Sequence, residues 1–272
     1  NNIEKGWRIL ENAKSWDLFG DPDDGDEDEW NYPRSFLTSD GNVVGYSYNK
    51  IWRMDKDDDF RVKKTGEIEL ETGGVSNLLW NIDPNNKHNH EMKMKLLTIG
   101  SPVGDTSSSV MIGKDLVYIF GGKQSGKEYA PSNKVLRIDF TDSSKPKVEK
   151  LKNIHFPRWN SNATILPTGE VLLNGGSAYN DVEFSIFNAE IYNPENETSK
   201  LMSKGYFRRN YHSTALLLPN GTVLISGGDV WNSEIFYPPY LFTKNWNNET
   251  VLAKRPIIKN IPSTINRGKL SF

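Results

Sequence analysis

Two adjacent side chains, Tyr211 and His212, are the clearest candidates for chemistry in this 272-residue chain. They stand directly before an apolar segment, residues 213–218, that leads into a Pro-Asn-Gly turn. A neutral imidazole is a common metal ligand, and a tyrosine can join it as a phenolate where a cation favours that form. The pair could bind a metal ion, or it could be a core tyrosine beside a hydrogen-bonded histidine, and the residue types alone do not decide.

Acidic residues give two weaker signals for a cation site. Asp55, Asp57 and Asp59 have the 1-3-5 spacing of a calcium loop, but Phe60 follows where such a loop needs glycine. Residues 21–29 hold seven acids without that spacing. We interpret both segments as solvated loops and keep calcium binding at the three aspartates as the alternative.

His88 and His90 form a second histidine pair. Side chains two positions apart on a strand face one way and could bind a metal together. The surrounding residues 81–95 are so polar that an exposed loop without a metal is the simpler interpretation.

The segment around Tyr211 and His212 is repeated upstream. Residues 158–176 and 209–228 share the patterns Ser-x-Ala, Leu-Pro-x-Gly and Val-Leu-x-x-Gly-Gly in register. Gly-Gly pairs at 121–122, 175–176 and 227–228 are spaced by 54 and 52 residues. A period near 50 residues is that of a kelch-type propeller, in which each blade has about four antiparallel strands.

The repeat therefore predicts an all-β chain with four-stranded blades. We expect them at residues 30–80, 103–152, 153–204 and 205–250. Gly122, Gly176 and Gly228 should be equivalent, and Gly45-Tyr46 should replace the Gly-Gly pair in the first blade. The hairpin tips of the blades should be Asp40-Gly41, Thr168-Gly169 and Asn220-Gly221.

The ends of the chain suggest a larger ring. Residues 1–20 look like the tail of a preceding blade, the chain starts without Met, and residues 270–272 end in what looks like mid-strand. Propellers typically close with 4–8 blades. We expect a processed or partial chain that holds about four blades of a larger, seven-bladed ring.

Composition excludes several classes of protein. A net charge of −2 gives no reason to expect nucleic acid as a partner. The sequence has no apolar run of 18 residues, so it predicts no transmembrane helix. The chain has no cysteine, so disulfides, thiolate metal sites and cysteine nucleophiles are excluded within it. An apolar content of 36% with 11% aromatic residues suits a globular β protein.

From about Trp30 to its end, the sequence resembles the C-terminal part of the galactose oxidase/glyoxal oxidase family of copper-radical oxidases. The most specific matching stretches are the Tyr-His-Ser block at 211–213 and the passage from Pro-Pro-Tyr-Leu at 238–241 to Arg-Pro at 255–256. Further matches, in chain order, are Tyr32-Pro33-Arg34, Arg158-Trp159 and residues 189–194.

The resemblance implies roles for three residues. Tyr211 would be the axial copper ligand and the base towards the alcohol, and His212 would be an equatorial ligand. Arg34 is the nearest match to the family's substrate-binding arginine, with one residue inserted. The family's radical tyrosine, its cross-linked cysteine and the second histidine ligand would lie outside this chain, so its copper site would be incomplete.

The resemblance also implies the domain organisation. Residues 1–250 would form the propeller segment, and residues 251–272 would begin a C-terminal immunoglobulin-like domain, a β-sandwich, with its first strand. The partners would be the remainder of the same propeller and domain together with a small alcohol, aldehyde or carbohydrate substrate.

The predicted function is an oxidase that acts on primary alcohols or aldehydes with O₂ and gives H₂O₂. The alternative is a non-catalytic kelch propeller for carbohydrate binding or surface assembly. We expect an extracellular or cell-surface glycoprotein. Its sequons are at Asn162, Asn196, Asn220 and Asn248, of which Asn162 is expected in a core strand and Asn220 at a turn tip.

Overall fold

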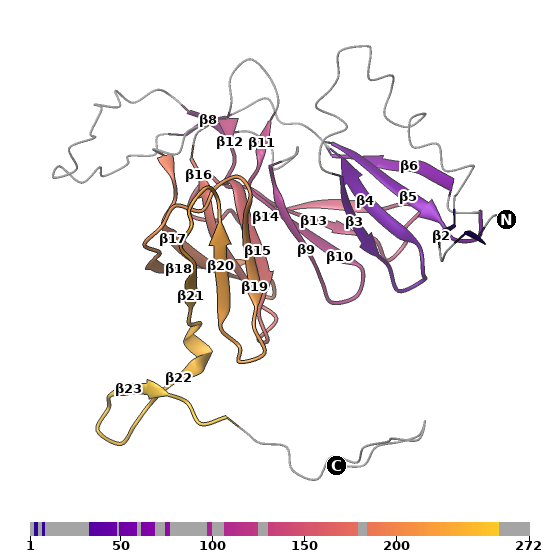
Figure 1. The fold of residues 1–272 in the computed structure, drawn as a ribbon. Helices are drawn as coiled ribbons and strands as arrows, with labels where there is room; N and C mark the ends of the chain where they lie inside the picture. The colour runs from indigo at the N-terminus through magenta and orange to yellow at the C-terminus, as the bar shows by residue number, and fades with distance from the viewer. Residues whose placement is uncertain are drawn as a thin grey trace, which may run out of the picture. The chain divides into compact units, whose positions relative to one another are not determined.

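A computed structural model describes most of the chain and is all-β (Figure 1). The described residues are 3–4, 7–8, 33–47, 49–58, 61–68, 74–76, 97–99, 106–124, 130–178 and 184–255. Within these ranges every strand pair is antiparallel, and η4 (Pro239–Leu241) is a short 3₁₀ turn. No helix in this part of the chain is long and apolar enough to span a membrane.

Three four-stranded sheets follow one another along the chain. The first sheet contains β3 (Arg34–Leu37), β4 (Val43–Ser47), β5 (Lys50–Asp55) and β6 (Arg61–Glu67). The second contains β9 (Ser108–Ile112), β10 (Leu116–Phe120), β13 (Val135–Asp139) and β14 (Lys147–Leu151). The third contains β15 (Trp159–Ile165), β16 (Val171–Ser177), β17 (Asn188–Asn193) and β18 (Thr198–Lys204). Successive antiparallel sheets of this kind give a propeller-like fold.

The fourth sheet has three strands, so the prediction of four strands in residues 205–250 is wrong. It contains β19 (Ser213–Leu217), β20 (Val223–Gly227) and β21 (Glu234–Phe236). Pro238 and Pro239 follow one residue after β21, and proline lacks the N–H that a ladder requires. The chain therefore leaves the sheet, and β22 (Phe242–Lys244) pairs with β23 (Thr250–Leu252) instead.

The remaining strands form two-stranded pairs. They are β1 (Ile3–Glu4) with β2 (Trp7–Arg8), β7 (Gly74–Ser76) with β8 (Leu97–Ile99), and β11 (Lys123–Gln124) with β12 (Ala130–Pro131). The chain divides into two compact units, Asn1–Phe236 and Tyr237–Phe272. The assignment of residues 251–272 to a separate immunoglobulin-like domain stays a prediction.

The three predicted hairpin tips are confirmed. Gly41, Gly169 and Gly221 have φ of 86°, 82° and 79°, and they join the first two strands of the first, third and fourth sheets. Each donates its N–H to the carbonyl three residues earlier, at 2.8 to 2.9 Å. Glycine supplies this left-handed backbone without a steric penalty.

The core lies between consecutive sheets. Val44, Tyr46 and Ile51 of the first sheet pack against a set from the second sheet that includes Val117 and Ile119. The other face of the second sheet packs against the third, where the Phe120 and Tyr192 rings meet edge to face at 5.2 Å. Both faces of the second sheet are therefore buried by its neighbours in the chain.

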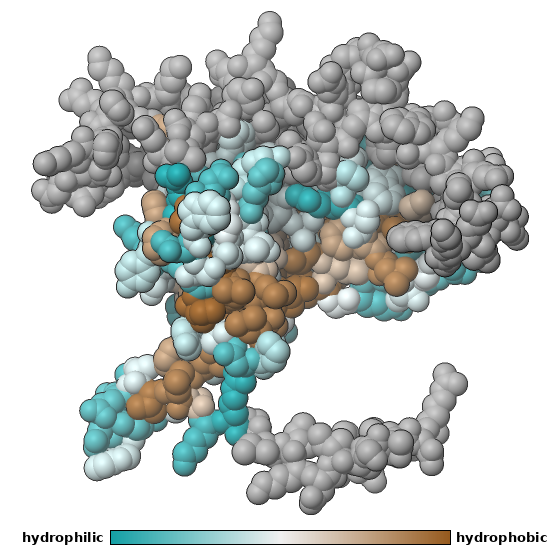
Figure 2. Space-filling model, viewed as in Figure 1, coloured by the Kyte–Doolittle hydropathy of each residue, from teal (hydrophilic) through white to brown (hydrophobic). Residues whose placement is uncertain are grey.

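The outer face of the fourth sheet is open among the described residues. Thr164, Leu172 and Ile191 form a row across the third sheet, and each is at most 9% exposed. The counterpart row in the fourth sheet is Leu216, Leu224 and Ile235, of which Leu216 is 59% and Ile235 43% exposed. Apolar side chains gather over this sheet in Figure 2. Closure of a larger ring over this face stays a prediction.

The Gly-Gly pairs are equivalent, as predicted. The N–H of Gly122 donates to the Arg158 carbonyl at 2.7 Å, and the N–H of Gly176 donates to the Arg209 carbonyl at 2.6 Å. A Cβ at Gly121 or Gly175 would overlap the same two carbonyl oxygens. We call the first strand of each sheet its innermost strand. The second glycine of each pair also faces a serine at or directly before the innermost strand of its sheet, which is Ser107, Ser161 or Ser213.

The expected substitute in the first sheet, Gly45-Tyr46, is placed wrongly. Counted from the hairpin tip, Ser47 of β4 takes the place of Gly175 in β16. Gly45 has another reason to be glycine, because a Cβ there would lie 2.5 Å from the Trp52 ring.

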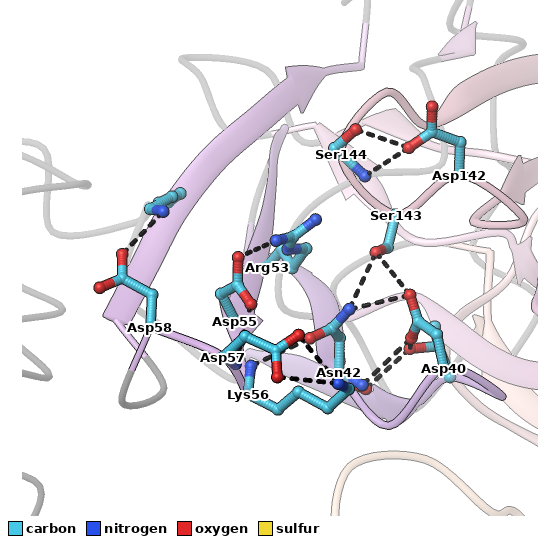
Figure 3. A network of polar contacts seen from close by, with 12 residues as sticks. Asp40, Asn42, Arg53, Asp55, Lys56, Asp57, Asp58, Asp142, Ser143 and Ser144 are labelled. Carbon is cyan, nitrogen blue, oxygen red and sulfur yellow. Dashed lines mark hydrogen bonds and ion pairs between the residues drawn. The ribbon is translucent and has the colours of Figure 1, made fainter.

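A polar network joins the first two sheets near the hairpin tip of the first (Figure 3). Asp40 accepts hydrogen bonds from Asn42 Nδ2 at 2.8 Å and from Ser143 Oγ at 3.2 Å. Burial alone would raise the pKa of Asp40, but these bonds and that from Thr38 outweigh it and hold the pKa below its ordinary value.

The aspartates considered for calcium point to cations of the protein in the same view. Asp55 pairs with Arg53, Asp57 pairs with Lys56 at 2.9 Å, and Asp59 lies outside the described residues. Residues 21–29 and the pair His88 and His90 also lie outside the described residues.

Arg158 and Glu190 form a fully buried ion pair in the third sheet. Nη2 and Nε of Arg158 donate to Glu190 Oε1 at 2.9 and 3.1 Å, and Nη1 donates to the Gly175 carbonyl at 2.6 Å. Burial by itself would raise the pKa of Glu190, but Arg158 and the hydrogen bonds to the carboxylate hold the pKa below its ordinary 4.5. The pair ties β17 to the Gly-Gly end of β16.

We predict that Gly175→Ala destabilises the fold more than Gly169→Ala. Both glycines have positive φ, so each substitution costs about 1 kcal/mol or more of backbone strain. A Cβ at Gly169 meets nothing within 4 Å, whereas one at Gly175 overlaps the Arg209 carbonyl. Urea unfolding of both variants measures the difference, and equal losses would contradict the close approach.

We also predict that Glu190→Gln costs about 3–5 kcal/mol near neutral pH, because it leaves the buried Arg158 charge unpaired. The folded-state pKa of Glu190 is depressed, so its contribution is present above the unfolded value of 4.5 and lost as the pH falls through the folded pKa. The stability gap between wild type and variant should therefore shrink below about pH 4.5. Urea unfolding at several pH values tests this, and a gap independent of pH would refute the assignment.

Candidate functional site

Tyr211 and His212 lie in a tight turn immediately before β19. The Asn210 carbonyl accepts the Ser213 N–H at 3.0 Å, which closes the turn around the two residues. His212 has a φ of 61°, in the left-handed region that few residues other than glycine adopt. The turn therefore fixes the backbone of both candidate ligands.

The two rings are stacked and accessible. Their centroids are 3.8 Å apart and their planes differ by 30°. The Tyr211 side chain is 44% exposed, and His212 is exposed as well. An imidazole and a phenol thus stand side by side where a ligand from solvent can reach them.

The preceding sheet has the same positions without the same chemistry. Asn160 has a φ of 53° and stands directly before Ser161, as His212 stands before Ser213. Trp159, the counterpart of Tyr211, is 5% exposed. Asparagine is a weak ligand for Cu(II) and tryptophan offers only an N–H donor. Of these two segments, that of the fourth sheet carries the side chains that a metal ion favours.

Arg209 forms the base of the turn. Its Nη1 donates to the Gly227 carbonyl at 2.8 Å, and its Nη2 donates to the Asn232 carbonyl at 2.6 Å and to Glu234 at 3.2 Å. Arg158 makes the same contacts in the third sheet with Gly175, Asn188 and Glu190.

Sequence reasoning missed both arginine–glutamate pairs. The available signal was a glutamate at the same place in two apolar strands, Glu190 and Glu234, matched by an arginine before each innermost strand.

Arg34 is the first residue of β3 and lies at the seam between the first two sheets. Its Nη2 donates to the Ser107 carbonyl at 3.0 Å, and Tyr46, its partner in register, shares a hydrogen bond of 3.0 Å with Ser107 Oγ. Burial raises the pKa of the Tyr46 phenol and keeps it neutral. Arg34 is half-buried and so only partly available to a substrate.

The innermost strands are connected side by side at the end where each begins. Ser108 Oγ donates to the Ser161 carbonyl at 2.6 Å, and Asn162 Nδ2 donates to Ser213 Oγ at 2.8 Å. Arg34 makes the corresponding bond between the first two sheets. Arg34 and His212 therefore lie towards the same end of the strand series, and their meeting at one site stays a prediction.

The donor set fits copper in type. Imidazole nitrogen and phenolate oxygen are ligands that Cu(II) accepts, and the exposed, stacked pair supplies one of each. Over the described ranges, no group of three or more His, Cys, Asp or Glu side chains gathers as a metal site. Tyr211 and His212 could hold part of a copper coordination sphere.

We predict that His212→Asn leaves the fold as stable as wild type, within about 0.5 kcal/mol, or stabilises it. The imidazole is exposed, and asparagine is among the residues that best tolerate left-handed backbone, as Asn160 shows at the equivalent position. Thermal unfolding measures this. A loss above about 1 kcal/mol would mean that the His212 ring is structural.

Comparison with known proteins places the chain in a family. The family model described as "Glyoxal oxidase N-terminus" matches residues 9–247. A galactose oxidase of Gibberella zeae is 33% identical in an alignment of 117 positions that covers 39% of this chain and 16% of that protein. An aldehyde oxidase of Arabidopsis thaliana is 25% identical in an alignment of 291 positions that covers 95% of this chain and 43% of that protein.

A solved structure supports the fold. A fungal alcohol oxidase of the AA5 family, in complex with copper, matches with a TM-score of 0.53 and 18% identity, over 84% of this chain and 56% of that one. The chain spans less than half the length of these curated relatives. By the family match over most of its length, the chain belongs to the glyoxal oxidase N-terminal family, which is related to the galactose oxidases.

Proposed function

We propose that this chain carries part of the active site of a copper-radical oxidase that acts on primary alcohols or aldehydes. Such an enzyme converts R–CH₂OH and O₂ into R–CHO and H₂O₂, so two electrons and two protons leave the alcohol. The family match supports an oxidase. The observation that carries the proposal is the exposed, stacked pair of Tyr211 and His212 on its turn.

Each candidate residue has a role in the proposal. The His212 imidazole and the Tyr211 oxygen hold copper, and Tyr211 takes the proton of the substrate hydroxyl as general base. Arg34 binds the substrate through its half-buried guanidinium, which also donates to the Ser107 carbonyl. Bound copper and a ligand radical supply the two one-electron acceptors that the oxidation requires.

We expect the remaining copper ligands outside these 272 residues. The chain has no cysteine, so the cross-linked cysteine of the family pattern has no counterpart in it. The second histidine ligand and the radical tyrosine are expected outside as well. The complete site would then need further chain.

The proposed location is extracellular or at the cell surface, with glycans on exposed sequons. Asn196, Asn220 and Asn248 are exposed, and Asn220 stands at the hairpin tip before Gly221. Asn162 is half-buried on β15 and bonded to Ser213, which makes it the poorest acceptor of the four.

We predict that the intact protein binds one Cu(II) and releases H₂O₂ from primary alcohols or aldehydes. His212→Ala should lower copper occupancy and abolish activity, and Tyr211→Phe should lower the turnover rate about 10²–10⁴-fold through loss of the base. Metal analysis and a peroxidase-coupled assay measure both. Asn160→Ala, at the equivalent position of the third sheet, is the control that should keep both properties.

Two outcomes would oppose the proposal. No copper in the intact protein, together with binding to glycans, would favour a non-catalytic propeller. The 272-residue chain by itself should not bind copper stoichiometrically. A stoichiometric Cu(II) signal from this chain that disappears in His212→Ala would show that the number of ligands expected elsewhere is mistaken.

A further inference from the structure

The third and fourth sheets share two fixed points near the start of their innermost strands, β15 and β19. The first is the arginine carbonyl, of Arg158 or Arg209, which accepts the N–H of the preceding sheet's second glycine at 2.7 or 2.6 Å. The second is the serine, Ser161 or Ser213, which packs on the second glycine of its own sheet. These points are equivalent in space, so the residues between them can be compared directly.

The fourth sheet has one more residue between these points. The third sheet has two, Trp159 and Asn160, whereas the fourth has Asn210, Tyr211 and His212. Because Asn160 and His212 share a left-handed backbone and precede the serine, the additional residue is Asn210.

The additional residue changes the path of the chain. In the third sheet β15 already starts at Trp159, which pairs with Ser177 and is 5% exposed. In the fourth sheet β19 starts only at Ser213, and the extra length forms the turn in which Tyr211 is 44% exposed. An extra residue opposite a continuous strand pushes the backbone out of the ladder.

Asn210 is itself held on two sides. It is 8% exposed, and its Nδ2 donates to Ser185 Oγ at 2.8 Å, on the chain that connects β16 and β17 of the third sheet. A Cβ at Gly228 would lie 2.9 Å from the Asn210 nitrogen, so glycine permits this close approach. The side chain thus fixes the turn to the neighbouring sheet.

The arrangement has local costs. His212 adopts a left-handed backbone, and the Asn210 Oδ1 is buried without a hydrogen-bond partner among the described residues. Strained backbone and unsatisfied polar atoms concentrate at functional sites, where the rest of the fold compensates for them.

We infer that Asn210 is the positioning residue of the Tyr211–His212 site. Its carbonyl accepts the Ser213 N–H that closes the turn, and its side chain fixes the turn to Ser185 of the third sheet. The turn thereby holds the Tyr211 and His212 rings in their stacked arrangement. That the turn serves copper binding rests on the proposed function, whereas the role of Asn210 in holding the turn does not depend on copper.

The test compares Asn210→Ala with two other variants. Ser185→Ala removes the same hydrogen bond from the other side. Asn162→Ala is the matched control, because it removes a bond of equal length between the same two sheets and leaves the turn intact. The readout is the imidazole ¹H–¹³C signal of His212, which the stacked Tyr211 ring displaces. The chain has four histidines, so His212→Gln assigns the signal.

Asn210→Ala and Ser185→Ala should both move the His212 signal towards that of a free imidazole. The double variant should move the signal little further, because both substitutions remove the same hydrogen bond. Asn162→Ala should leave it in place. An unchanged His212 signal in a folded Asn210→Ala protein would overturn the inference. If Asn210→Ala does not fold, Ser185→Ala decides by the same criterion.

A copper titration of the intact protein separates this inference from the proposed function. Loss of a residue that orients a ligand typically costs 10–100-fold in metal affinity, so we expect at least about 10-fold weaker Cu(II) binding in Asn210→Ala. Wild-type binding that does not depend on His212 would refute the proposed function only. Binding that depends on His212 and is unchanged in Asn210→Ala would refute the positioning role only.

Discussion

The arrangement of the second, third and fourth sheets depends on one kind of contact. The N–H of a glycine at the end of one sheet donates to the carbonyl of the arginine that stands before the innermost strand of the next sheet. It joins Gly122 to Arg158 and Gly176 to Arg209. A side chain on the preceding glycine would overlap the same carbonyl oxygen, so the hydrogen bond can form only where that residue has no Cβ. The second and third sheets thereby determine where the innermost strand of the next sheet begins.

The charged residues reinforce this contact from within. Arg158 donates to the Gly175 carbonyl and is neutralised by Glu190, and Arg209 does the same with Gly227 and Glu234. A buried ion pair seldom adds much net stability over an apolar pair, but it disfavours other arrangements because each charge needs its partner. The arginine–glutamate pairs thus favour one arrangement of the residues around each glycine–arginine contact.

The candidate site occurs where the repeat is broken. The third sheet continues from its arginine straight into a strand, whereas the fourth inserts a closed turn that carries Tyr211 and His212. The same arginine carbonyl and the same serine flank both segments, so the candidate site rests on one local departure from an otherwise repeated frame. The chain belongs to the glyoxal oxidase N-terminal family, and a fold of this kind takes its function from its site.

The sequence by itself determined the repeat, the all-β class, the hairpin tips and the equivalent Gly-Gly pairs, because these depend on local backbone preferences and spacing. It also indicated the family through the Tyr-His-Ser block. Only the tertiary structure decided that the fourth sheet stops at three strands, and that Arg34 bonds to Ser107 at a seam. The burial of the Arg158–Glu190 pair likewise emerged only there. These features depend on contacts between distant residues, which a linear pattern does not specify.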